Sequence, residues 1–431
     1  MRKNLLPVAG FFVLLIMIFI GCNKNQSANH PKQFTSIDLV PEEVAKTVAQ
    51  KFSPNTFFPK NDATAPTQIA SLLNGNNQIK NQFIIKDASG NPAFYVFNFA
   101  DNAGFLFVSG DYKIQPILGF VEHGEFKKDA VPATYIEWGN KTVENVEIVR
   151  QQLYDNSRLA NASWKDYFKK TGITGITPSV AGKYPPPDPG CQETTNSVIV
   201  GPLLPVTWGQ GCSYNDLCPS ASCTNICAFT TNAWTGCVAT SMAQVIRYWS
   251  PANGYGYNYA SMPTGSGNGE VQRLMRDAGS TVGMSYGCSG SGANGGNVPG
   301  ALTGSFGFTS ANRHSYGGST YSQVQSNLSY HWPVLLEGCS SRTNVFLGIY
   351  YTYSDCHEWV CDGYIATDYT WCNPDGTQGG AGYLSFHMNW GWHETWGGND
   401  YNGWFAFNNW NISGAGLNFQ YAQDCVTEIH P

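Results

Sequence analysis

The sequence predicts an α+β protein made of two units with different chemistry, and three observations lead to this prediction. The charge changes sign along the chain: residues 1–183 hold 16 Lys and 3 Arg against 15 acidic residues, whereas residues 184–431 hold no Lys, 5 Arg and 15 acidic residues. Twelve of the 13 cysteines follow residue 184. Helical and strand-like hydrophobic patterns occur in both parts. A chain of 431 residues is long enough for each unit to bury its own core.

Composition excludes two classes of protein. With 42% hydrophobic residues, 13 Trp and 24 Phe, the chain is too apolar to be largely disordered. Its net charge of −6 argues against nucleic acid as the main partner.

The N-terminus predicts export. Arg2 and Lys3 precede an apolar run over residues 5–20, which is short of the roughly 20 residues that span a membrane. The run ends in Ile20, Gly21 and Cys22, similar to a bacterial lipobox, whose cysteine becomes the lipidated first residue. We therefore expect a signal peptide over residues 1–22 and a polar tether over 23–35; an ordinary cleaved signal is the alternative. The predicted location is the cell envelope or surface, with later release of the second unit.

The first unit, residues 36–180, is predicted to be a small α+β domain. Residues 41–52 place apolar side chains on one face of a short helix, and residues 133–154 show a second helical pattern. Residues 93–99 and 105–108 read as strands joined by a turn. This unit has no cysteine and no catalytic constellation, so we expect a structural or inhibitory role. The Pro-rich linker over 181–200 is a natural place for activating cleavage.

Cys237 is the candidate nucleophile of the second unit, residues 201–431. It opens a segment, residues 237–249, whose apolar side chains recur at helical spacing. Thr235 is a plausible N-cap, and Gly236 allows close backbone approach. The positive end of the helix dipole favours a thiolate at this position. The alternative roles are a disulfide or a small buried side chain.

His357 is the candidate general base. It lies in a predicted strand that ends in a turn at Asp362 and Gly363. Residues 381–392 alternate with period two, which places His387 and Asn389 on one face. A thiol hydrolase needs a base and a group that orients it. The order Cys237, His357, Asn389 has separations of 120 and 152 residues, similar to papain-like enzymes. His387 is the rival base.

The other cysteines are predicted to form disulfides, because export leads to an oxidising compartment. A zinc site at Cys212, Cys218, Cys223 and Cys227 is the alternative, but these residues lack paired CxxC spacing. If maturation removes Cys191, ten cysteines besides Cys237 remain in the mature protein, enough for five disulfides. Reduction would then add ten hydrogens.

These motifs together resemble the streptopain family of bacterial cysteine peptidases, which are papain-like. The matching segments, in the family's order, are PLLPVTWGQ (202–210), TGCVAT (235–240), MSYG (284–287), His357 with Asp362 and Gly363, and NWGW (389–392). The segments NPAFYVFNF (91–99), GFLFVSGD (104–111) and PILGF (116–120) resemble the family's inhibitory prodomain.

The resemblance implies a papain-like peptidase domain, with a helical part and an antiparallel β part, behind an inhibitory prodomain. Cys237 would be the nucleophile, His357 the base, and Gln210 part of the oxyanion hole. Asn389 or Trp390 would orient the histidine; both possibilities stay open. Ser291 and Gly292 would border the substrate cleft. Cys356 replaces the family's glycine before the histidine, where a disulfide would narrow the cleft or make activity depend on redox state.

The expected function is therefore that of an exported cysteine endopeptidase, made as a latent zymogen and acting on proteins or peptides without metal or organic cofactor. Its prodomain would be an intramolecular inhibitor, attracted by the opposite charge of the second unit. Nucleic acid is not an expected partner, and the membrane is one only through the lipid anchor. A catalytically lapsed surface binding or adhesive module is the alternative function, and an acyltransferase or amidase is a third.

Overall fold

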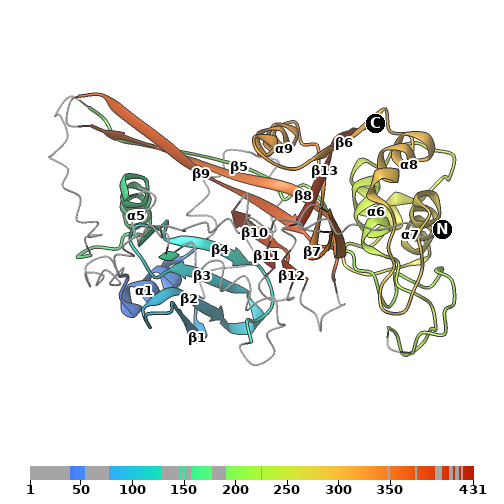
Figure 1. Ribbon diagram of the computed structural model, residues 1–431, viewed down its shortest axis with the longest axis horizontal. Helices are drawn as coiled ribbons and strands as arrows, with labels where there is room; N and C mark the ends of the chain where they lie inside the picture. The colour runs from blue at the N-terminus through green and yellow to red at the C-terminus, as the bar shows by residue number, and fades with distance from the viewer. Residues whose placement is uncertain are drawn as a thin grey trace, which may run out of the picture. The chain divides into compact units, whose positions relative to one another are not determined.

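One antiparallel sheet runs through both predicted units. The computed structural model (Figure 1) describes residues 39–53, 77–127, 157–176, 191–224, 226–346, 350–373, 376–393, 400–406 and 421–431, with a few isolated positions between them. The strand order is β1-β2-β3-β4-β10-β9-β8-β7-β13-β6, and β5 pairs with β8. The charge break in the sequence is therefore not a break in the sheet.

The first unit supplies the strands at one end of this sheet, covered by helices. These elements are α1 (Glu42–Lys51), β1 (Ile79–Lys86), β2 (Pro92–Phe99), β3 (Phe105–Ser109), β4 (Ile117–Val121) and α5 (Ser157–Thr171). The helix predicted over 41–52 and the two strands are confirmed. Their core gathers Val48, Phe52, Tyr95, Phe97 and Trp164, all fully buried. Most of the helix predicted over 133–154 lies outside the described residues, but residues 143, 146–147 and 149–150 are helical.

The seam between the two units is a strand pair. Strand β4 lies antiparallel to β10 (Gly403–Ala406), with Phe120 opposite Trp404. The described seam combines strand pairing and apolar packing with polar contacts, among them the donation from Trp404 Nε1 to Glu122 Oε1 at 3.2 Å. The attraction between a basic prodomain and an acidic peptidase stays a prediction.

The second unit begins with helices that pack on the sheet. They are α6 (Cys237–Trp249), α7 (Gly269–Val282), α8 (Val298–Ser305) and α9 (Thr320–Ser329). Helices α6, α7 and α8 lie on the face of Leu335 and Val360, and α9 lies on the opposite face of Leu336 and Trp359. The helix predicted from Cys237 is confirmed residue for residue. Val238, Met242 and Val245 enter a core with Leu274 and Leu335. This core fixes α6, and with it Cys237, against the sheet.

The remaining strands form the β part of the second unit. They are β6 (Ser310–Ser315), β7 (Val334–Phe346), β8 (Tyr350–Cys372), β9 (Gln378–Asn389) and β13 (Tyr421–His430), with the short pair β11 (Asn411–Ile412) and β12 (Leu417–Asn418). The predicted turn at Asp362 and Gly363 is wrong. Strand β8 continues through these residues with a register shift against β9, a bulge, because partners on both sides keep it extended.

Part of the predicted linker is a strand. Thr194–Val200 forms β5, which pairs along β8 from Tyr364 to Thr370. The linker prediction over 181–200 is therefore corrected at its C-terminal end, because seven consecutive residues find a ladder partner that the sequence does not reveal. Residues 177–190 and the predicted signal and tether, with Cys22, lie outside the described residues. Among the residues that are described, no helix is long and apolar enough to cross a membrane.

Candidate active site

Cys237 is the first residue of α6, and a tight backbone approach places it there. Gly236 has φ of 88°, and a Cβ at this position would lie 2.7 Å from Met284 Sδ and 2.8 Å from the carbonyl oxygen of Ser291. Only glycine fits both the conformation and the space. The prediction that Thr235 is the N-cap is wrong: Gly236 occupies the cap, and the Thr235 hydroxyl instead contacts Gln210 O at 3.3 Å and Thr240 Oγ1 at 2.9 Å.

Gln210 is held beside this helix start, as the sequence motif requires. The backbone N–H of Thr235 donates to the carbonyl oxygen of Gln210 at 3.1 Å. The Gln210 side chain reaches across to the loop after β9, where Nε2 donates to the carbonyl oxygen of Gly391 at 3.3 Å. The part of Gln210 in an oxyanion hole stays a prediction.

The surroundings of Cys237 raise the pKa of its thiol. Burial raises its pKa to about 12; the backbone N–H of Glu358 lowers the pKa, whereas the charges of Glu358 and Glu337 raise it. The expectation that the helix dipole would yield a thiolate is wrong for the chain that still carries its first unit. Desolvation and neighbouring carboxylates outweigh the dipole here.

His357 is buried and engaged elsewhere. Its Nε2 lies 2.8 Å from the carbonyl oxygen of Trp390, and its ring stacks near Trp359 and lies 4.7 Å from the ring of Trp392. Burial lowers its pKa to about 4, although the bond to Trp390 opposes this. Since a carbonyl oxygen only accepts, Nε2 carries the proton. A neutral imidazole in this state cannot take a proton through Nε2.

Alternation along β8 sends the side chains of His357 and Glu358 to opposite faces of the strand. Glu358 contacts Ser241 of α6, so its face of the strand looks toward the helices. The neighbouring positions His357 and Trp359 look to the other face, where Trp359 Nε1 donates to Met388 Sδ at 3.1 Å. The structure therefore brings the backbone of His357 to the helix that carries Cys237, while the imidazole lies among the tryptophans.

Asn389 and Trp390 differ in what they contact. The amide of Asn389 donates to the carbonyl oxygen of Val206 at 2.8 Å, and its Oδ1 accepts from Gly391 N at 3.4 Å. These bonds hold the loop after β9 to the segment before Gln210. In this state, contact with the His357 imidazole comes from Trp390.

The rival His387 belongs to a different cluster. Its Nδ1 lies 2.6 Å from Asp362 Oδ1, and its Nε2 lies 3.8 Å from Glu122 of the first unit. Burial lowers the pKa of His387, but the nearby carboxylates raise it more, so that it is raised overall. A buried histidine flanked by two carboxylates is suited to holding structure together.

The residues expected at the cleft lie beside Cys237. Ser291 Oγ donates to the carbonyl oxygen of Trp234 at 2.7 Å, and Gly292 is exposed while pairing with Ser285. Cys356 forms a disulfide with Cys339 across β7 and β8. The structure thus places both segments near the start of α6, and their roles in substrate binding remain predictions.

The cysteine pairing differs from the expected count. The disulfides are Cys191–Cys372, Cys212–Cys227, Cys223–Cys288 and Cys339–Cys356, and the thiols of Cys218, Cys237, Cys361 and Cys425 are free. The prediction of five bridges without Cys191 is wrong, because β5 carries Cys191 to the far end of β8. The cysteines considered for zinc are split between two disulfides and a free thiol. The described residues contain no group of three metal-ligating side chains.

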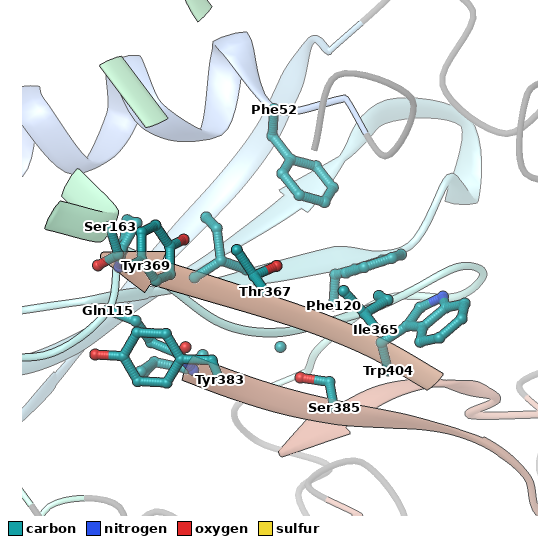
Figure 2. Close-up of a pocket in the computed structure, with 14 residues that line it drawn as sticks. Phe52, Gln115, Phe120, Ser163, Ile365, Thr367, Tyr369, Tyr383, Ser385 and Trp404 are labelled. Atoms are coloured by element: carbon teal, nitrogen blue, oxygen red, sulfur yellow. The ribbon is translucent and has the colours of Figure 1, made fainter. Parts of the chain in front are cut away.

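A separate cavity lies at the seam of the two units (Figure 2). Phe52, Phe120 and Ser163 of the first unit line it, opposite Ile365, Tyr369, Tyr383 and Trp404 of the second. It contains none of the predicted catalytic residues, so we assign it to the seam and not to the reaction.

Sequence reasoning missed Glu358. This side chain is 2% exposed and lies 2.6 Å from the hydroxyl of Ser241, one helical turn after Cys237. A signal was present, since a glutamate stands directly after the candidate histidine within a strand of buried residues. Only the neighbouring His357 was considered as a catalytic residue in this segment.

Comparisons with known proteins show which families this chain is similar to. Residues 208–269 and 256–405 match the model of the Peptidase C10 family, and residues 38–145 match the Spi protease inhibitor. The thiol protease/hemagglutinin PrtT of Porphyromonas gingivalis is 25% identical over 396 residues, which are 81% of this chain and 37% of that protein. The chain thus spans little more than a third of the length of that curated relative.

Two solved structures are also similar. The active wild-type interpain A cysteine protease of Prevotella intermedia is 25% identical, with a TM-score of 0.41, over 54% of this chain and 96% of that one. A prointerpain A fragment from the same organism is 23% identical, with a TM-score of 0.47, over 81% of this chain and 99% of that one. Residues 208–405 thus match the Peptidase C10 family behind an inhibitor match over residues 38–145, an order similar to that of a streptopain-like cysteine peptidase with an inhibitory prodomain.

Proposed function

We propose that the chain is an exported cysteine endopeptidase that hydrolyses proteins or peptides with Cys237 as nucleophile and His357 as base. The observation that carries this proposal is the position of Cys237 at the N-terminus of α6, flanked by Gln210 and by the strand that bears His357. A nucleophile, an amide for the oxyanion and a nearby imidazole on separate elements are what acyl transfer requires.

In the reaction, the Cys237 thiolate attacks the peptide carbonyl carbon, and its oxygen becomes an oxyanion. The Gln210 amide and the backbone N–H of Cys237 donate to that oxyanion. His357, protonated by the thiol, gives its proton to the leaving amine. It then takes a proton from the water that releases the acyl group. Trp390 and Asn389 would hold the loop against which the imidazole turns.

Latency has a physical basis in the same contacts. With the pKa of Cys237 raised to about 12 and that of His357 lowered to about 4, both groups are neutral over the range between. With Nε2–H donating to the Trp390 carbonyl, Nδ1 is the nitrogen that must accept the thiol proton, and activation must bring Nδ1 within reach of the Cys237 sulfur. Only then can the proton pass from sulfur to imidazole.

The activating cut is proposed to lie before Cys191. Strand β5 is held to β8 by seven paired residues and by the Cys191–Cys372 disulfide, so residues 191–200 belong with the peptidase. A cut after Cys191 would leave the prodomain tethered through this disulfide. The export and lipid-anchor proposals rest on the N-terminal sequence pattern and on the disulfides.

The experiment uses the absence of lysine after residue 183. A lysine-specific protease can remove the prodomain from any variant and cannot cut the peptidase, so activation does not depend on the chain's own activity. After this treatment, Cys237→Ala should show no cleavage of an unfolded protein, whereas Cys218→Ala, which removes another buried free thiol, should cleave it. Wild-type cleavage by Cys237→Ala would disprove the assignment.

A further inference from the structure

Glu358 links the two elements that carry the candidate nucleophile and base. It follows His357 in β8, and its carboxyl oxygen Oε1 lies 2.6 Å from Ser241 Oγ on α6. Ser241 lies one helical turn after Cys237. The Glu358 side chain is nearly inaccessible, and its Oε2 is buried without a hydrogen-bond partner. A carboxylate in such a place would be costly, because a buried charge needs several donors.

The hydrogen bonds of Ser241 show where a proton resides. Its hydroxyl lies 2.6 Å from Glu358 Oε1 and also 3.0 Å from the carbonyl oxygen of Val238. A hydroxyl has one proton to donate, and a carbonyl oxygen can only accept. If Ser241 donates to Val238, its oxygen is left to accept from a protonated Glu358, an arrangement that gives each contact its own proton.

The opposite strand leads to the same protonation state. Glu337 of β7 is directly across from Glu358 in the antiparallel register, an arrangement that is unfavourable for two like charges. Glu337 Oε2 lies 2.5 Å from Nη2 of Arg313, which also bonds Asp424 at 2.8 Å. Because Arg313 compensates the charge of Glu337, Glu358 is the member of the pair that keeps its proton. Burial and the charge of Glu337 raise its pKa to about 8, while Ser241 and Arg313 oppose the shift.

We propose that Glu358 is a positioning residue for the peptidase reaction, which as a neutral carboxylic acid donates to Ser241 and clamps the strand of His357 to the helix of Cys237. This inference rests on the proposed function. The groups that face Glu358 are Cys237 and Ser241 from α6 and Glu337 from β7, with Arg313 of β6 and Asp424 of β13 behind it. Neutrality has a second consequence: Glu358 itself adds no negative charge beside the sulfur that must ionise.

Four variants of the full chain test the clamp. Glu358→Gln keeps a neutral donor of the same size, Glu358→Ala removes it, and Ser241→Ala removes the acceptor. Glu428→Gln makes the same carboxyl-to-amide change at a half-buried site on β13 and is the matched control. After prodomain removal with the lysine-specific protease, kcat and KM are measured for each protein.

Glu358→Gln and Glu428→Gln should keep kcat within about threefold of wild type. Glu358→Ala and Ser241→Ala should lose about tenfold or more in kcat with little change in KM, because misplacement of reacting groups affects the chemical step. Wild-type kcat in Glu358→Ala, or an equal loss in Glu358→Gln, would overturn the proposal. A wild-type protein that neither cleaves substrate nor reacts at Cys237 would instead refute the proposed function.

Infrared difference spectra test the protonation state of Glu358 without the alanine variant, so the test holds even when that variant does not fold. Near pH 6, the full-length wild-type chain should show the carbonyl stretch of a buried protonated carboxyl, which Glu358→Gln lacks and Glu428→Gln retains. Identical spectra for wild type and Glu358→Gln would show that Glu358 is ionised and would overturn the clamp.

Discussion

His357 Nε2 lies 2.8 Å from the carbonyl oxygen of Trp390, and this bond turns the imidazole into the tryptophan-lined face of the sheet. Strand alternation directs the next side chain, Glu358, toward the helix of Cys237. The catalytic groups are thus on adjacent elements without forming an ion pair. Latency in this chain depends on the direction of the His357 side chain and on the desolvation of Cys237, as well as on any covering of the active site by the prodomain.

Thiol reactivity should distinguish the two states of the protein. With the pKa of Cys237 raised to about 12, the full-length chain should react with iodoacetamide at pH 7 far more slowly than the protein freed of its prodomain, since the thiolate is the reactive form. Stopped-time labelling and peptide mass analysis measure this. Equal rates would show that the thiol is already ionised in the zymogen.

The buried imidazole should make stability depend on pH. The pKa of His357 is lowered from 6.5 to about 4, so the unfolded chain binds the proton more readily between these values. Stability should therefore fall as the pH drops from 6.5 to 4, by about 3 kcal/mol from this group. Urea unfolding of wild type and His357→Gln at several pH values isolates the effect. Parallel pH curves for the two proteins would contradict it.

The rival histidine should matter for folding more than for the reaction. His387→Ala leaves Asp362 buried without its 2.6 Å partner, which should cost about 3–5 kcal/mol of stability. Its activity per folded, prodomain-free molecule should stay near wild type, whereas His357→Ala should lose activity. Active-site titration and turnover measurements separate these effects. The reverse pattern would exchange the two assignments.

The apolar seam should control release of the prodomain. Phe120 packs against Phe52 at 5.1 Å between ring centroids and lies opposite Trp404 of the peptidase. Phe120→Ala should destabilise the full chain by about 3–5 kcal/mol and raise its activity before processing. Phe229→Ala changes a ring that is 93% exposed and should have little effect on either property. A Phe120→Ala chain that remains silent until cleavage would show that the seam does not maintain latency.

Mass analysis tests the disulfide pattern. Reduction should add eight hydrogens within residues 191–425, two for each of the four disulfides. Cys191 should stay attached to the peptidase through Cys372 after lysine-specific cleavage. A gain of ten hydrogens would restore the five-bridge arrangement that the sequence suggested.

The hydrophobic pattern of the sequence predicted the elements that depend on local interactions. The helix from Cys237 and the helix at Glu42–Lys51 follow from periodicity, which burial of one face enforces, whereas the alternation predicted for β9 is not seen in its burial, because residues 386–389 are buried on both faces. Gly236 was singled out correctly because its φ of 88° and its contacts leave room for no side chain.

What escaped prediction depends on partners distant in the sequence. Thr194–Val200 looks like linker until β8 pairs with it, and Asp362 looks like a turn until strands on both sides hold it extended. Thr235 does not cap the helix, because its hydroxyl bonds Gln210 and Thr240 instead. The protonation of Cys237 and the direction of the His357 ring depend on desolvation, which no spacing of residues records.

The most direct test of the account is covalent labelling by an epoxide thiol inhibitor after lysine-specific removal of the prodomain, with the modified residue identified by peptide mass analysis. The account predicts one label per molecule, on Cys237, with matching loss of proteolysis and no label on Cys218, Cys361 or Cys425. Full loss of activity with Cys237 unmodified, or a fully labelled Cys237 in a protein that still cleaves substrate, would contradict it.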